Sequence, residues 1–97
     1  AEQLLRVGLR HSPDHPILQA NMGSLLLRLG RTADAVPHLE RAEYWQPHVT
    51  AVRINLAVAY LKLQRLNAAQ EQLRHVIATD PTNEAAKKMS VQIASMG

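Results

Sequence analysis

Apolar side chains recur every three to four positions through most of this sequence, which is the spacing of one face of an α-helix. In residues 16–29 the apolar positions with this spacing are Leu18, Met22, Leu25, Leu26 and Leu29. In residues 50–63 they are Val52, Leu56, Ala57, Tyr60 and Leu63. We therefore expect an all-α fold of six helices, near residues 1–12, 16–29, 33–45, 49–63, 67–79 and 83–96.

Glycine and capping residues predict where these helices end. Gly30 supplies the left-handed residue that stops a helix. Thr32 or Asp34 is then expected to cap the following helix. Asn67 is the expected cap of the helix at 67–79, with Gln70 three residues further on.

Two residues in this pattern are unusual for their positions. Pro37 lies in a helical stretch, so we expect it near the first turn, where a missing N–H costs least. Gln64 stands where Gly30 stands one unit earlier. A non-glycine residue in a left-handed conformation costs on the order of 1 kcal/mol, so we expect this turn to have a different shape.

A fixed period of 34 residues runs through the chain. It carries Pro13, Pro47 and Pro81, then Ala1, Ala35 and Ala69, and also Leu5, Leu39 and Leu73. Residues 16–49 and 50–83 share seven identical positions in this register. A constant period of this length predicts a repeat architecture.

The repeat resembles the tetratricopeptide-repeat family, in which each 34-residue unit is a pair of antiparallel helices. The residues that carry the resemblance are Gly23, Ala35, Ala42, Ala57, Ala69 and Val76 at small positions, Leu26 and Tyr60 at a large position, and the closing Pro47 and Pro81. Departures are Gln64, and Gln19 and Arg53 where the family often has Trp. The resemblance implies an α-solenoid that winds as a right-handed superhelix.

The resemblance also predicts how the chain is divided. Residues 1–97 are expected to form a single domain, with 1–15 the second helix of a partial repeat. Residues 16–49 and 50–83 are two repeats, and 84–97 form a capping helix with polar Lys87, Lys88 and Gln92 outward. This arrangement favours the C-terminal end of a longer array.

Composition and charge limit the classes of partner that we expect. Apolar residues make up 46% of the chain, which suits a folded soluble domain, and no apolar run is long enough for direct membrane insertion. The net charge of +3 slightly favours acidic partners. We expect no platform of aromatic side chains on which bases could stack, and we therefore predict no nucleic-acid partner. The absence of cysteine fits the cytoplasm and the periplasm alike; we slightly favour the cytoplasm.

The sequence lacks any recognisable catalytic or metal-binding pattern. The five histidines are scattered, and the two that are four residues apart, His11 and His15, flank Pro13. We interpret all five as surface residues and expect no metal, no cofactor and no enzyme activity.

The family binds partners in the concave groove lined by the first helix of each unit. The resemblance places in this groove Ile17, Ala20, Asn21, Ser24, Leu27, Arg28, Ala51, Ile54, Asn55, Val58, Leu61, Lys62, Lys88 and Gln92. Asn21 and Asn55 are expected to hydrogen-bond a peptide backbone, because an amide both donates and accepts. The alternative is that each completes a neighbouring helix end.

Basic residues in the groove predict the charge of its ligand. Arg28, Lys62 and Lys88 favour an acidic partner, with ordinary solvated charge as the alternative. Ala20 and Ser24 occupy the positions where the family's two-carboxylate clamp begins, so we do not predict a receptor for chaperone tails.

Two functional classes remain open. The first is a scaffold that binds a peptide or helical segment of another protein in the groove. The second is a module that forms homo-oligomers through exposed helix faces or solenoid ends. Leu4, Leu5, Val7 and Leu9 favour the second class, because a helix over 1–12 would leave part of them uncovered.

Overall fold

The computed structural model describes residues 15–96, which contain five helices and no strand. The helices are α2 (Pro16–Arg28), α3 (Thr32–Trp45), α4 (Thr50–Lys62), α5 (Leu66–Thr79) and α6 (Glu84–Met96). Each end differs by at most one residue from the bounds predicted from the sequence. The sixth helix, predicted for residues 1–12, lies outside the described residues.

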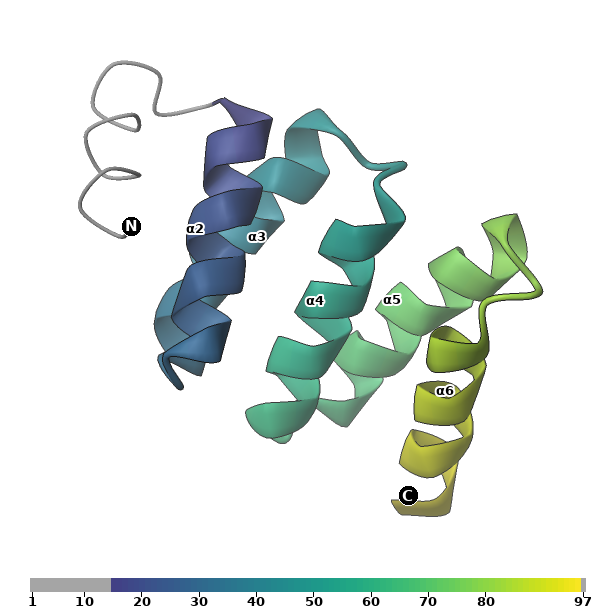
Figure 1. Ribbon diagram of the computed structural model, residues 1–97. Coiled ribbons are helices and arrows are strands. Elements are labelled where there is room, and N and C mark those ends of the chain that lie inside the picture. Colours follow the sequence, from purple (N-terminus) through teal and green to yellow (C-terminus); the bar gives the residue numbers. More distant parts are fainter. Residues whose placement is uncertain (1–14, 97) are drawn as a thin grey trace.

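The helices stack as pairs in chain order (Figure 1). α2 packs on α3, α4 packs on both α3 and α5, and α6 packs on α5. Figure 1 shows α2, α4 and α6 along one side of the stack, with α3 and α5 along the other. One side of the molecule is therefore built from the first helix of every pair.

Leucines and small residues fill the space between the helices. Leu39, Leu56 and Leu73 are completely buried. At the crossing of α2 with α3, a Cβ added to Gly23 would lie only 2.5 Å from Leu39 Cγ and 2.6 Å from its Cδ2. Glycine thus lets α3 approach α2 closely, as the resemblance implies for this position.

The turns after α2 and α4 have the same shape, contrary to the sequence-based expectation. Gly30 has φ 79° and Gln64 has φ 63°, so both residues are left-handed. The same pair of backbone hydrogen bonds closes each turn. They are Gly30 N–H to Leu27 O at 3.1 Å, Arg31 N–H to Leu26 O at 2.9 Å, Gln64 N–H to Leu61 O at 3.1 Å and Arg65 N–H to Tyr60 O at 2.8 Å. These bonds hold the turn even where its residue is a glutamine.

The predicted caps of α3 and α5 are wrong. Thr32 and Asn67 lie inside their helices, and the capping positions are Arg31 and Arg65, which make no side-chain cap bond. The preceding turn ends on these same arginines, so no capping residue fits between the helices. The Asp34 carboxylate instead accepts a hydrogen bond from Arg31 Nε at 3.1 Å.

The starts of α3 and α6 also differ, because α3 has a proline in its second turn and α6 has a side-chain cap. Pro37 is the sixth residue of α3, just past the first turn near which we expected it. The start of α6 does carry a side-chain cap, because Asn83 Oδ1 accepts a hydrogen bond from Ala86 N–H at 3.0 Å. α6 buries only Ala86 and Ile93, whereas α4 buries five residues.

Candidate functional site

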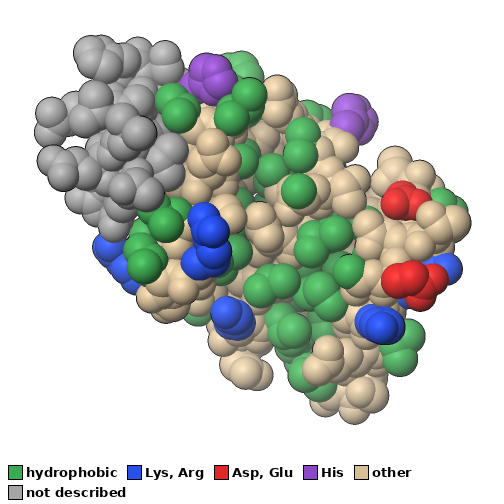
Figure 2. All heavy atoms as spheres, viewed as in Figure 1, with side chains coloured by type: hydrophobic (Ala, Val, Ile, Leu, Met, Phe, Trp, Pro, Cys, Tyr) green, Lys and Arg blue, Asp and Glu red, His purple; other side chains and the backbone are tan. Residues whose placement is uncertain are grey.

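Figure 2 views the molecule from the same side as Figure 1, and the surface of α2, α4 and α6 on this side is here called the front face. The residues expected to bind a partner belong to these three helices. All of them keep part of their surface open. The exposed ones are Ile17, Asn21, Arg28, Ala51, Lys62, Lys88 and Gln92. The half-buried ones are Ala20, Ser24, Leu27, Ile54, Asn55, Val58 and Leu61.

Asn21 and Asn55 occupy equivalent positions on α2 and α4. Neither side-chain amide makes a hydrogen bond to another residue in the described part of the chain. The alternative role, in which each amide completes a neighbouring helix end, therefore has no hydrogen bond to support it. Both amides are available to a ligand.

The front face carries more positive than negative charge. α2 and α4 contain no Asp or Glu, and α6 contains only Glu84. Arg28, Lys62 and Lys88 have no carboxylate within 4 Å among residues 15–96. Arg28 and Lys62 lie in the last turns of their helices, where they also offset the partial negative charge of the helix end. Lys88 lies inside α6 and has no such role.

Acidic side chains lie mainly on the other helices. Asp34, Glu40 and Glu43 belong to α3, and Glu71 belongs to α5. The two sides of the stack thus differ in charge, and the front face is the one that suits an acidic ligand.

Hydrophobic side chains gather in the middle of the front face, over α4 and α6, with basic side chains on either side (Figure 2). Ile54, Leu61 and Met89 pack against the core while remaining only partly buried. Val58 is also half-buried. A ligand on this face would contact apolar as well as charged groups.

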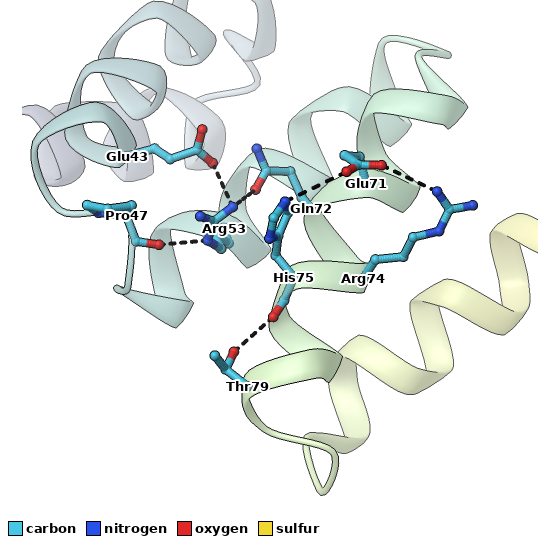
Figure 3. A network of polar contacts seen from close by, with 8 residues as sticks. All are labelled: Glu43, Pro47, Arg53, Glu71, Gln72, Arg74, His75 and Thr79. Atoms are coloured by element: carbon cyan, nitrogen blue, oxygen red, sulfur yellow. Dashed lines mark hydrogen bonds and ion pairs between the residues drawn. The ribbon is translucent and has the colours of Figure 1, made fainter.

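Arg53 makes a polar network that the sequence did not reveal (Figure 3). Its Nε donates to Pro47 O at 2.7 Å, and its Nη1 donates to Gln72 Oε1 at 3.0 Å. Nη1 also lies 3.4 Å from Glu43 Oε2. One guanidinium on α4 thereby joins α3, the following turn and α5. The sequence had identified Arg53 only as a departure from the family's Trp.

The equivalent position in the preceding pair is Gln19, which is 1% exposed. Its Oε1 lies 2.8 Å from His38 Nδ1. Interpreting His38 as a surface residue was therefore wrong, because it is half-buried against a buried amide. The register offered a signal, since Gln19 pairs with His38 as Arg53 pairs with Gln72 one unit later.

Two further links hold neighbouring pairs together. Tyr60 Oη donates to Glu40 Oε2 at 2.7 Å, which ties α4 to α3. Burial, and then this hydrogen bond, raise the pKa of Tyr60 well above its ordinary value. Between α5 and α6, Ser90 Oγ donates to Gln70 Oε1 at 2.9 Å, and Gln70 Nε2 donates to Ser90 O at 3.3 Å.

Residues 15–96 contain no cluster of three or more His, Asp or Glu side chains that could hold a metal ion. In the same residues, no helix has the length and apolar character needed to cross a membrane.

Comparison with known families identifies the class of protein. A tetratricopeptide-repeat model matches residues 26–93, and the chain therefore belongs to the tetratricopeptide-repeat family. Its fold is that of a helical-repeat scaffold for protein interactions. No curated protein matches the chain.

Solved structures have the same fold at low sequence identity. The first tetratricopeptide-repeat domain of Spaghetti (RPAP3), bound to the HSP90 peptide SRMEEVD, has a TM-score of 0.91 and 23% identity over 98% of this chain and 75% of that chain. The first such domain of human RPAP3 has a TM-score of 0.87 and 24% identity over the same shares. MamA of MSR-1 has a TM-score of 0.89 and 20% identity, and this chain spans 55% of its length.

Proposed function

We propose that the protein binds an acidic segment of a partner protein, extended or helical, on its front face. The observation that carries this proposal is the pair Asn21 and Asn55, whose amides have no bond to another described residue and lie on two helices without acidic residues. The Spaghetti domain, a structural relative, is bound to a peptide with three acidic residues.

The repeat spacing suits an extended backbone. Packed helices lie about 9–10 Å apart. An extended peptide advances about 3.3 Å per residue, so Asn21 and Asn55 can reach backbone groups about three residues apart. Each hydrogen bond contributes about 0.5–1.5 kcal/mol and each exposed ion pair about 0.2–1 kcal/mol. Since ordering the peptide opposes these gains, we expect micromolar affinity at best.

The resemblance argues against a chaperone-tail ligand. Ala20 and Ser24 replace the groups with which the family's clamp begins, so a terminal carboxylate loses its expected partners. We propose an internal acidic segment instead.

The test starts from a random peptide library displayed on phage and selected on the purified protein. Enriched peptides should carry acidic residues, and calorimetry should show weaker binding at high salt. The double variant Asn21→Ala with Asn55→Ala should lose about tenfold in affinity or more. Asn67→Ala, an exposed amide on α5, is the matched control. Full affinity in the double variant would show that the ligand uses another face.

Self-assembly is the second candidate function, and exposed apolar side chains on α6 favour it. Val91 is 70% exposed and Met96 is 53% exposed. We propose that the pairs continue a right-handed superhelix whose ends associate. Sedimentation equilibrium of Val91→Glu beside the parent protein tests this: a monomeric parent at high concentration would exclude it.

Self-association through residues 1–12 remains a prediction, because those residues lie outside the described part of the chain. Leu5→Glu should then shift the parent protein from oligomer to monomer.

A further inference from the structure

The front face has two seams between helices, and they differ in width. Cα atoms of α2 and α4 come within 8 Å of each other at several positions, whereas α4 and α6 approach less closely. Figure 1 shows α5 behind the space between α4 and α6. The seam between α4 and α6 is therefore the wider of the two.

The side chains over the wider seam are larger or more apolar than the residues 34 positions earlier in the chain. Ile54 on α4 corresponds to Ala20 on α2, and Val58 corresponds to Ser24. Met89 on α6, half-buried against the core, corresponds to Asn55. Figure 2 shows hydrophobic side chains concentrated over α4 and α6. The seam offers apolar surface to a bulky side chain of a ligand.

Lysines stand on both sides of this apolar surface. Lys62 ends α4 and Lys88 lies in the second turn of α6; both are exposed, and neither has a carboxylate within 4 Å among the described residues. Glu84, one turn before Lys88, is the sole carboxylate that the sequences of α2, α4 and α6 contain. Flanking carboxylates on a ligand would complement these lysines.

The geometry points to a specific partner class: a segment with one or two bulky apolar residues flanked on both sides by carboxylates, anchored in the α4–α6 seam. This inference rests on the proposed function and deepens it. The apolar residues displace water from Val58 and Met89, while the carboxylates fix the register against Lys62 and Lys88. The amides of Asn21 and Asn55 then hold the backbone without selecting a sequence.

Three synthetic peptides test the chemistry of this partner. The first has two leucines with two glutamates on each side, and its ends are acetylated and amidated so that no terminal charge contributes. The second replaces the leucines by serines, and the third replaces the glutamates by glutamines. The first peptide should bind about tenfold tighter than either other. Equal binding of the serine peptide, or no binding of the first at millimolar concentration, would overturn the inference.

Variants of the protein test the place. Met89→Gln keeps the length of the side chain but removes its apolar character, and should weaken binding of the first peptide about tenfold. Lys88→Ala should weaken it about threefold, less at high salt. Arg41→Ala, an exposed basic residue on α3 at the other side of the stack, is the matched control for charge. Circular dichroism verifies that each variant stays folded.

The results separate the inference from the function on which it rests. If Met89→Gln and Lys88→Ala bind normally while Asn21→Ala with Asn55→Ala fails, the front face still binds but the seam is not the anchor. If all of these variants bind normally, both proposals are wrong.

Discussion

The helix pairs α2–α3 and α4–α5 have helices of the same lengths, 13 and 14 residues, and turns of the same shape, yet different side chains hold them together. The first pair has Gln19, Gly23, Leu26 and Gly30 where the second has Arg53, Ala57, Tyr60 and Gln64. The first relies on close approach and a relaxed turn. The second relies on the hydrogen bond from Arg53 to Gln72, and Arg53 and Tyr60 also bind carboxylates on α3 of the first pair. The backbone of the repeat thus tolerates quite different solutions at the same positions.

Removing Arg53 should cause the largest loss of stability, because its guanidinium joins α3, the following turn and α5. Arg53→Ala leaves the nearly buried Gln72 and the half-buried Glu43 without their partner, and should destabilise the protein by about 2–3 kcal/mol. Urea unfolding followed by circular dichroism measures the change. Arg74→Ala, which breaks an exposed pair, is the control and should cost less than about 0.5 kcal/mol. Equal losses in the two variants would contradict the role assigned to Arg53.

Replacing Gly23 of the first pair by alanine, the residue at the equivalent position of the second pair, tests how closely α2 and α3 pack. Gly23→Ala gains about 1 kcal/mol in helix propensity, but the new methyl overlaps Leu39, which is completely buried and cannot retreat. Overpacking costs about 1–3 kcal/mol, so after the gain in helix propensity we expect a net loss of up to about 2 kcal/mol. The same unfolding experiment measures it. Increased stability would mean that α3 moves away from α2 at little cost.

The opposite exchange in the turn should stabilise the protein. Gln64→Gly relieves a left-handed glutamine, which costs about 1–2 kcal/mol, but it also makes the unfolded chain more flexible. The expected gain is about 0.5–1 kcal/mol, seen as a higher urea midpoint. Gly30→Gln should lose a similar amount. If neither variant shifts the midpoint, the strain is absorbed elsewhere in the turn.

The smallest effect at neutral pH should come from Tyr60→Phe, about 0.5 kcal/mol, because the exposed Glu40 regains water as a partner. The difference in stability between the parent and the variant should change with pH. The raised pKa keeps Tyr60 protonated in the folded state, while the same tyrosine in the unfolded chain ionises near pH 10. The contribution of Tyr60 to stability is therefore complete below about pH 10 and falls as the pH rises toward the folded pKa. Unfolding curves at pH 7, 9 and 11 should show the parent losing more stability than the variant; parallel losses would refute the linkage.

The sequence predicted the five described helices because their signals are local. Apolar spacing and the 34-residue period are properties of short segments, and the matching residues, such as Leu39 and Leu73, are those that the core buries. The predicted front-face residues also lie on α2, α4 and α6, since a period fixes which helix carries each of them.

The features that were missed depend on contacts between segments or on competition at helix ends. Arg53, Tyr60 and Gln70 find partners about 20 residues away, and the period alone does not say which side chains reach each other. Thr32 and Asn67 have capping side chains, but the preceding turns already use the capping positions. The shape of the Gln64 turn follows from its backbone hydrogen bonds rather than from its residue type.

The light packing of α6 has a consequence for how the molecule opens. In a linear array each helix is stabilised only by its neighbours, so the cost of opening varies along the chain. α6 buries two side chains and is held by the Gln70–Ser90 pair, whereas α4 is fixed on two sides by Arg53 and Tyr60. Amide protons of α6 should therefore exchange with solvent earlier than those of α4. Because α6 carries Lys88 and Met89, its more frequent opening would expose and re-form this part of the front face. Ligand binding and release at these residues would then depend on the opening of α6.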